Sequence, residues 1–72
     1  MKVKLTKLKE APNPLHPNNI DVGYEKIGEF MKEPTVGEPF WLGWYWATSN
    51  VQEIIDSNTF RTHNSIYRYE FI

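Results

Sequence analysis

Phe40-Trp-Leu-Gly-Trp-Tyr-Trp46 decides the fold, because five of these seven residues are aromatic and aromatic side chains favour β-strands. Side chains alternate between the two faces of a strand, so both faces of this strand would be apolar. A small barrel has one interior and cannot hide both. Part of this aromatic surface is therefore expected to be exposed to a partner or ligand, or covered by the Pro-rich loop of residues 11–22 or by residues 24–31. One face carries Phe40, Leu42, Trp44 and Trp46, and the other carries Trp41 and Tyr45.

Downstream of this stretch, the sequence predicts three short strands joined by tight polar turns, which together form an antiparallel meander. In the last strand, a period of two places Tyr67, Tyr69 and Phe71 on one face. The expected strands are Val51–Asp56, Thr59–His63 and Ile66–Ile72, with turns at 56–58 and 64–65.

Upstream, residues 2–7 alternate polar and apolar side chains, which predicts a half-buried strand with Val3 and Leu5 in the core. Residues 11–22 contain three prolines, which lack backbone donors and push the preceding residues into extended conformations. We expect this Pro-rich segment to be a long loop.

Residues 24–31 leave two alternatives open. Tyr24, Ile27 and Met31 have helical spacing, but Gly23 and Gly28 lower the helix propensity. The segment is predicted as a short helix or as an extended strand around 27–31.

These elements define a single domain, residues 1–72, that is mainly β. We predict a small SH3-like, partly open antiparallel barrel of about five strands, with one short helix as an option and an OB-like barrel as the second choice. The expected core consists of Val3, Leu5, Phe40, Leu42, Trp44, Ile54, Phe60 and either Tyr67 or Ile66.

Composition narrows the class of protein. A chain of 72 residues allows one small core, which its 15% of aromatic residues can fill. The absence of cysteine argues against a disulfide framework and a thiolate zinc site, and no apolar run is long enough to span a bilayer. The sequence therefore predicts a cytoplasmic protein that does not enter a membrane.

The charges sum to −1 but are divided along the chain. Residues 1–10 carry four lysines against one glutamate, a charge of +3, and residues 21–38 carry five acidic residues against two lysines, a charge of −3. Proteins that neutralise many phosphates are usually strongly basic, so the sum does not favour duplex DNA as a partner. The two segments are interpreted as solvated faces or, alternatively, as a basic strand of one subunit that meets an acidic edge of another.

Patterns typical of catalysis or metal binding are missing from the sequence. His16 and His63 lie far apart and lack the short spacing of zinc ligands. Glu25 and Glu29 would share a helical face, which is typical of a solvated surface, and the glycines match no phosphate-binding loop. We predict no enzymatic activity, cofactor or metal; a hydrolase acting through Glu25 or His63 is the least favoured alternative.

The segment from 61 to 68 is the candidate ligand site. It brings two guanidinium groups, several hydrogen-bonding side chains and an aromatic ring to one hairpin, a mixture that suits a phosphate-bearing or nucleobase ligand. Alternatively, residues 64–65 are only a turn and the arginines only solubilise the strands. The candidate ligand-binding residues are Arg61, Asn64, Ser65, Tyr67 and Arg68, with His16 and Asn18 as loop contacts.

Trp41 and Tyr45 form the second candidate surface, which would bind a protein or a nucleic acid. The aromatic residues exceed what one small barrel can hide, and residues 66–72 are expected to form an exposed pairing edge. We therefore predict a homo-oligomer, most simply a dimer.

Thr48–Asp56 and Phe60–Tyr67, together with Pro14–Asn19, resemble the tiny single-domain proteins encoded by tailed bacteriophages. The resemblance covers residues 12–19 and 37–72, and no family binding residue is carried over from it. Some phage proteins of this size form oligomers that sequester nucleotide second messengers, such as the cyclic oligonucleotides of CBASS immunity.

The resemblance implies a non-enzymatic protein of the host cytoplasm that sequesters a nucleotide-type ligand and so inhibits host defence signalling. The alternative is a nucleic-acid-binding or protein-interaction module of phage gene expression or of the virion, with a host protein as a possible partner class.

Overall fold

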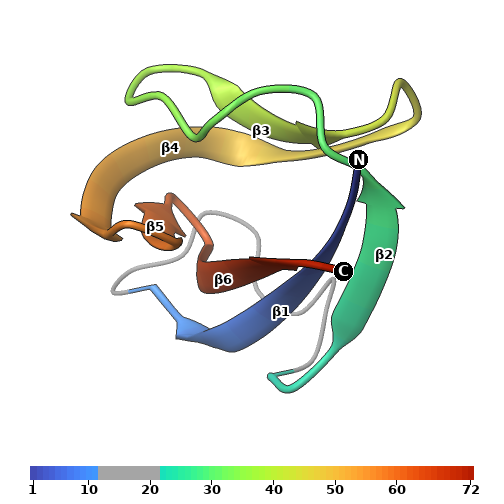
Figure 1. The fold of residues 1–72 in the computed structure, drawn as a ribbon. Coiled ribbons are helices and arrows are strands. Elements are labelled where there is room, and N and C mark those ends of the chain that lie inside the picture. The colour runs from blue at the N-terminus through green and yellow to red at the C-terminus, as the bar shows by residue number, and fades with distance from the viewer. Residues whose placement is uncertain (12–21) are drawn as a thin grey trace.

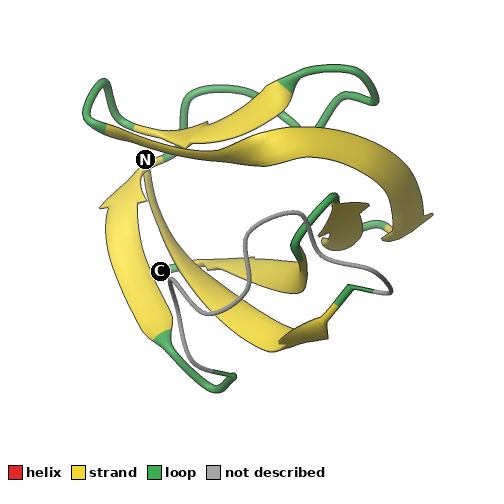
Figure 2. Ribbon diagram, turned by 180° about the vertical axis from the view of Figure 1, so that it is seen from behind, coloured by secondary structure: helices red, strands yellow, loops and turns green. Residues whose placement is uncertain are grey.

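Antiparallel pairing builds the described structure. The computed structural model describes residues 1–11 and 22–72, and in these residues the chain forms six strands and no helix. A single sheet in the order β2-β1-β6-β5-β4-β3 curls into a nearly closed barrel (Figures 1 and 2). The strands are β1 (Lys2–Glu10), β2 (Glu25–Glu29), β3 (Pro39–Leu42), β4 (Trp46–Asp56), β5 (Thr59–Thr62) and β6 (Ser65–Phe71).

The barrel closes where β2 meets β3. Phe30 forms a β-bridge with Leu42, and the Gly43 N–H donates to the Glu29 carbonyl at an N···O distance of 2.9 Å. A Cβ atom at Gly28 would lie only 3.1 Å from the Leu42 Cβ, so the glycine lets the two strands approach. The small, mainly β antiparallel barrel predicted from the sequence is confirmed, with six strands in the described residues where about five were expected.

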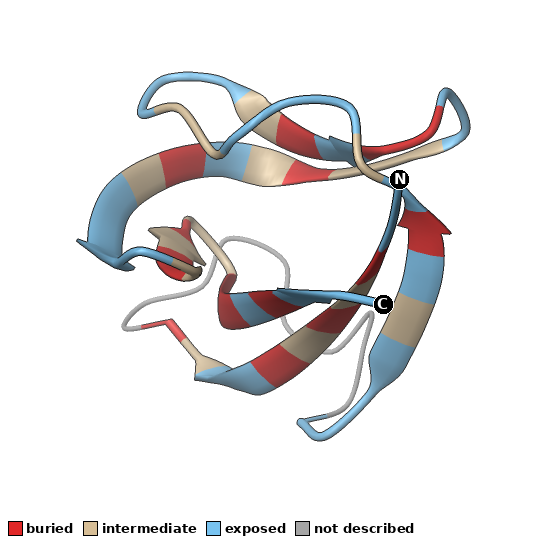
Figure 3. Ribbon diagram, in the orientation of Figure 1, coloured by how far each residue is buried: buried red, intermediate tan, exposed pale blue. Residues whose placement is uncertain are grey.

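Aromatic rings fill the interior. The ring centroids of Phe40 and Phe60 are 4.9 Å apart, and those of Phe40 and Tyr69 are 5.6 Å apart. From Val3 to Lys7 of β1, buried residues alternate with less buried ones, as expected for a strand with one face in the core (Figure 3). β6 instead begins with three buried residues, 65–67, and alternates only after them. The predicted core members that are buried are Val3, Leu5, Phe40, Leu42, Phe60 and both Tyr67 and Ile66.

The prediction that Trp44 lies in the core is wrong, because the aromatic stretch is not one strand. β3 ends at Leu42, and residues 43–45 turn the chain into β4. Gly43 has a positive φ of 60°, a conformation that interrupts the alternation of a strand. Trp44 consequently sits in the turn with 86% of its surface exposed.

Ile54 is also not a core residue, since it is 46% exposed. The register of β4 against β5 shifts between Val51 and Glu53 and again between Ile54 and Asp56. Such irregularities interrupt the alternation of side chains between the two faces of a strand, so alternation along β4 wrongly predicts that Ile54 faces the core.

Residues 25–29 form a strand, so the extended alternative for this region is confirmed and the short helix is not formed. β2 pairs with β1, with Lys2 opposite Glu29 and Thr6 opposite Glu25. The Pro-rich loop predicted for residues 11–22 lies outside the described residues, apart from its first and last positions.

The prediction that the final strand is an exposed edge is wrong. β6 lies inside the sheet, paired with β1 on one side and β5 on the other. The reason is topological: the sheet brings the first and last strands together, a long-range pairing that local sequence does not reveal.

Candidate functional site

Arg61 and Arg68 lie on the outer surface of the β5–β6 hairpin. Tyr67 points into the barrel, so Arg68 next to it points outward, and the register places Arg61 on the same outer face. Arg61 Nε lies 3.2 Å from a carboxylate oxygen of Glu53, and the Arg68 guanidinium lies 3.4 Å from one of Glu70. Each arginine is therefore paired with a carboxylate on the protein surface.

The other predicted ligand residues are placed differently. Ser65 and Tyr67 are buried on the inner face, and Asn64 lies in the turn between β5 and β6. The structure thus brings Asn64 and Ser65 together and separates them from the outward arginines. His16 and Asn18 lie outside the described residues.

Thr62 organises this turn. Its hydroxyl oxygen accepts hydrogen bonds from the N–H groups of Asn64 (3.2 Å) and Ser65 (3.1 Å), and its hydroxyl donates to the Ser65 carbonyl (3.2 Å). The Asn64 side-chain amide donates to the Ser49 hydroxyl on β4 at 3.4 Å, and the Ala11 N–H donates to the Asn64 carbonyl at 3.1 Å. The turn is therefore tied to β4 and to the end of β1.

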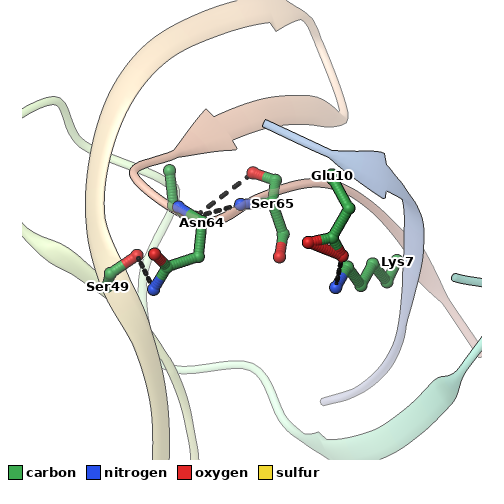
Figure 4. Close-up of polar contacts among 6 residues, drawn as sticks. Lys7, Glu10, Ser49, Asn64 and Ser65 are labelled. Carbon is green, nitrogen blue, oxygen red and sulfur yellow. Dashed lines mark hydrogen bonds and ion pairs between the residues drawn. The ribbon is translucent and has the colours of Figure 1, made fainter. Parts of the chain in front are cut away.

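Lys7 lies buried at the same end of the barrel, with 3% of its surface exposed. It forms an ion pair with Glu10, and Glu10 pairs with Ser65 across β1 and β6, which brings the ion pair to the turn (Figure 4). Burial raises the pKa of the Tyr67 phenol, while a hydrogen bond with Ser65 and the charge of Lys7 oppose the rise. The phenol therefore stays protonated at neutral pH.

We call Lys7, Glu10, Ser49, Thr62, Asn64 and Ser65 the polar cluster. In the described part of the chain, every buried side-chain nitrogen or oxygen has a hydrogen-bond partner. Such mutual pairing offsets the cost of burying polar groups, so the cluster fastens one end of the barrel. Lys7 was not among the predicted core or site residues, although it has the same parity along the first strand as the buried Val3 and Leu5.

The basic and acidic segments meet within one chain, because β1 pairs with β2. The Lys4 ammonium lies 3.6 Å from the Glu25 carboxylate, and the N-terminal amine pairs with Glu29. The interaction with the amine lowers the pKa of Glu29. Among the charged residues of these two segments that the structure describes, only Lys7 is buried, which favours a solvated face, one of the two interpretations drawn from the sequence.

His63 faces Gln52, with 2.9 Å between their Nε2 atoms.

Across residues 1–11 and 22–72, no group of three or more His, Cys, Asp or Glu side chains is arranged to hold a metal ion. The same residues contain no helix that is long and apolar enough to cross a membrane.

The β3–β4 turn exposes two tryptophans beside a groove. Trp44 at the tip and Trp41, which is 44% exposed, line an open groove of about 470 Å³ together with Met31, Lys32 and Gly43. We call this hollow the Trp groove. Its lining is mostly apolar, which makes it the strongest candidate for binding among the described residues.

Tyr45, the other residue predicted for this surface, is 70% exposed and lies at the closure of the barrel. Its ring lies against Gly43, where a Cβ would come within 2.9 Å of it, and its hydroxyl lies over Gly28. Tyr45 therefore braces the turn that carries Trp44.

A second hollow, of about 300 Å³, lies between residues 33–34 and the β4–β5 turn. The Asn58 N–H donates to the Asp56 carboxylate at 3.0 Å, and this hydrogen bond is the main cause of the lowered pKa of Asp56. Burial raises the pKa of Tyr69, and the charge of Glu33 adds to the rise. We call this hollow the acidic pocket; its lining residues are Glu33, Pro34, Ile54, Asp56, Ser57 and Tyr69.

Comparison of the chain with protein-family models, with curated proteins and with solved structures found no match.

Proposed function

We propose that this protein is a non-enzymatic protein-interaction module that binds an extended apolar segment of a partner protein in the Trp groove. The observation that carries the proposal is the exposure of Trp41 and Trp44 beside an apolar groove of about 470 Å³. Tryptophan is enriched among the residues that dominate protein interfaces, because one side chain buries a large area on binding.

The turn that carries Trp44 is held in place before any ligand arrives. The Gly43 N–H is bonded to the Glu29 carbonyl at 2.9 Å, and the Tyr45 ring lies against Gly43. A surface held in one conformation loses less conformational entropy on binding. The position of the turn therefore supports recognition by a largely preformed site.

Charge favours a protein over a nucleic acid as the partner. Lys32, the cation that lines the groove, lies 2.7 Å from the Glu38 carboxylate, and Glu33 follows it in sequence. A phosphate chain would meet these carboxylates at a cost, whereas an apolar peptide segment would not. Under the resemblance to phage proteins, the partner would belong to the host; the cytoplasmic location and the SH3-like form of the barrel stay predictions.

The test is a titration of ¹⁵N-labelled protein with a panel of blocked eight-residue peptides rich in proline and leucine, followed through the tryptophan indole N–H signals. We expect peptides that bind to shift the signals of Trp41 and Trp44. Trp44→Ala should weaken binding at least tenfold while the melting temperature stays within a few degrees, because an exposed side chain contributes little to folding. Ile55→Ala, an exposed apolar change on β4, is the matched control and should leave binding unchanged.

Equal peptide binding by the wild type and Trp44→Ala would refute the proposal. The same titration with mono-, di- and cyclic nucleotides examines the other hypothesis. A nucleotide that binds, and whose binding is lost in Arg61→Ala and Arg68→Ala, would instead favour sequestration of a nucleotide-type ligand.

A further inference from the structure

The segment from Met31 to Pro34 borders both hollows. Met31 and Lys32 line the Trp groove, and Glu33 and Pro34 line the acidic pocket. Consecutive residues of an extended chain advance by about 3.3 Å each, so residues 31 and 34 lie within about 10 Å of each other along the chain. The two hollows therefore share this segment as a common border.

The acidic pocket has the chemistry to receive a cationic side chain. Glu33 and Asp56 supply carboxylates, and no lysine or arginine is among the described residues that line the pocket. Hydrogen bonding within the β4–β5 turn lowers the pKa of Asp56, so this carboxylate is charged at neutral pH. Pro34 and Ile54 add apolar surface beside the carboxylates.

Lysine and arginine match this combination of charged and apolar surface. Their alkyl stems pack on apolar surface while the charged head reaches a carboxylate. The acidic pocket is thus complementary in charge to a basic side chain and borders an apolar groove for the neighbouring residues.

We propose that the partner segment bound in the Trp groove carries a lysine or arginine two to four residues from its apolar anchor, and that Glu33 and Asp56 receive this charge. This inference rests on the proposed function and names the class of partner: an extended segment that is both apolar and basic.

The test uses two matched sets of blocked eight-residue peptides. Each peptide has one Leu-Pro anchor, and a single arginine stands two, three or four residues from it; the second set has glutamine in place of arginine. We expect the best arginine peptide to bind about tenfold more tightly than its glutamine counterpart, and the difference to shrink as salt is raised from 50 to 500 mM.

Variants of the protein locate the effect. Glu33→Gln and Asp56→Asn should each remove most of the preference for arginine without changing the affinity for the glutamine peptide. Asparagine can keep the turn that Asp56 makes with the Asn58 N–H, so this change removes the charge and keeps the fold. Glu53→Gln, an exposed carboxylate on the same strand that does not line the pocket, is the control and should keep the preference.

The outcomes separate the two proposals. If both peptide sets bind equally and Trp44→Ala weakens both, the Trp groove is the site but the basic residue plays no part, and this inference is overturned. A preference for arginine that survives in both Glu33→Gln and Asp56→Asn also overturns it. If neither set binds at millimolar concentration, the proposed function fails and this inference fails with it.

Discussion

Two hairpin turns of the same barrel differ in which side chains they bury and which they expose. The β5–β6 turn buries polar groups, and Thr62, Asn64 and Ser65 satisfy one another there. The β3–β4 turn instead exposes Trp44 and leaves an apolar groove open beside it. The contrast between the two turns shows that a set of ligand-like residue types is a poor guide to a binding site, because buried polar groups whose hydrogen bonds are already made inside the protein have little left to offer a ligand.

The largest expected effect comes from removing the core on which both turns rest. Phe60 is fully buried between Phe40 and Tyr67, so Phe60→Ala should cost about 3 to 5 kcal/mol, which is most of the stability of a domain this small. Urea unfolding followed by circular dichroism measures the loss. Phe71→Ala, at a half-exposed ring, is the control and should cost clearly less. Equal losses in the two variants would contradict the assignment of the core.

The next largest effect is expected from a substitution at Thr62, which disturbs the β5–β6 turn and leaves the β3–β4 turn intact. Thr62→Val keeps the shape of the side chain but removes the oxygen that accepts from two backbone N–H groups, so we expect a loss of about 1 to 3 kcal/mol. Thr62→Ser keeps the hydroxyl and should lose much less. Peptide binding at the Trp groove should be unchanged in both variants that remain folded, since the two turns are separate. If Thr62→Val is as stable as the wild type, the turn does not depend on this network.

Alanine substitutions at two glycines test how the β3–β4 turn is held in place. Gly43 and Gly37 both have positive φ, but only at Gly43 would a Cβ meet a neighbour, the Tyr45 ring at 2.9 Å. Both alanine variants should lose about 1 to 2 kcal/mol from backbone strain. Gly43→Ala should lose additional stability beyond this strain, because the new Cβ displaces the Tyr45 ring. It should also weaken peptide binding, because Tyr45 holds the turn that carries Trp44. Identical behaviour of the two variants in thermal melts and titrations would show that Tyr45 does not hold the turn.

The smallest effect concerns acid. The N-terminal amine lowers the pKa of Glu29 below its ordinary value of 4.5, so the folded state binds this proton less readily than the unfolded state does. The contribution of Glu29 to stability is therefore present above that pH and is lost as the pH falls through the lower, folded pKa. Glu29→Gln should flatten the acid side of a plot of melting temperature against pH and leave the neutral region nearly unchanged. If the curves of Glu29→Gln and the wild type coincide, Glu29 does not contribute to the loss of stability in acid. Glu53→Gln, at another exposed carboxylate, is the control.

Much of the fold could be predicted from the sequence because it follows from local pattern. Alternation placed Val3 and Leu5 inside, and the glycines and prolines made a helix over residues 24–31 unfavourable. Long-range pairing could not be predicted in this way: no local signal shows that β6 lies beside β1. The exposure of Trp44 depends on the turn at Gly43, where a single positive φ ends the strand pattern.

The candidate sites show the same limit. Trp41 was predicted at an exposed aromatic surface, and the structure places it in the Trp groove because its neighbours Phe40 and Leu42 face the core. The set around Arg61 and Arg68 was assembled by residue type, and strand alternation divides it between two faces. Met31 and Lys32 reach the groove because they follow Phe30, whose bridge to Leu42 closes the barrel, and this long-range contact leaves no local signal in the sequence.

The pairing of β1 with β6 has a consequence for how the chain is made. Synthesis runs from the N-terminus, so β1 can pair early with β2 but must wait for the last strand before its other edge is filled. Pairings this distant in sequence also slow folding, because closing a long loop costs chain entropy before the stabilising contacts between the strands can form. We expect Val3 and Leu5 to stay exposed in the nascent chain until β6 has been synthesised, so that a chain truncated within β6 aggregates, whereas a chain that contains all of β6 folds.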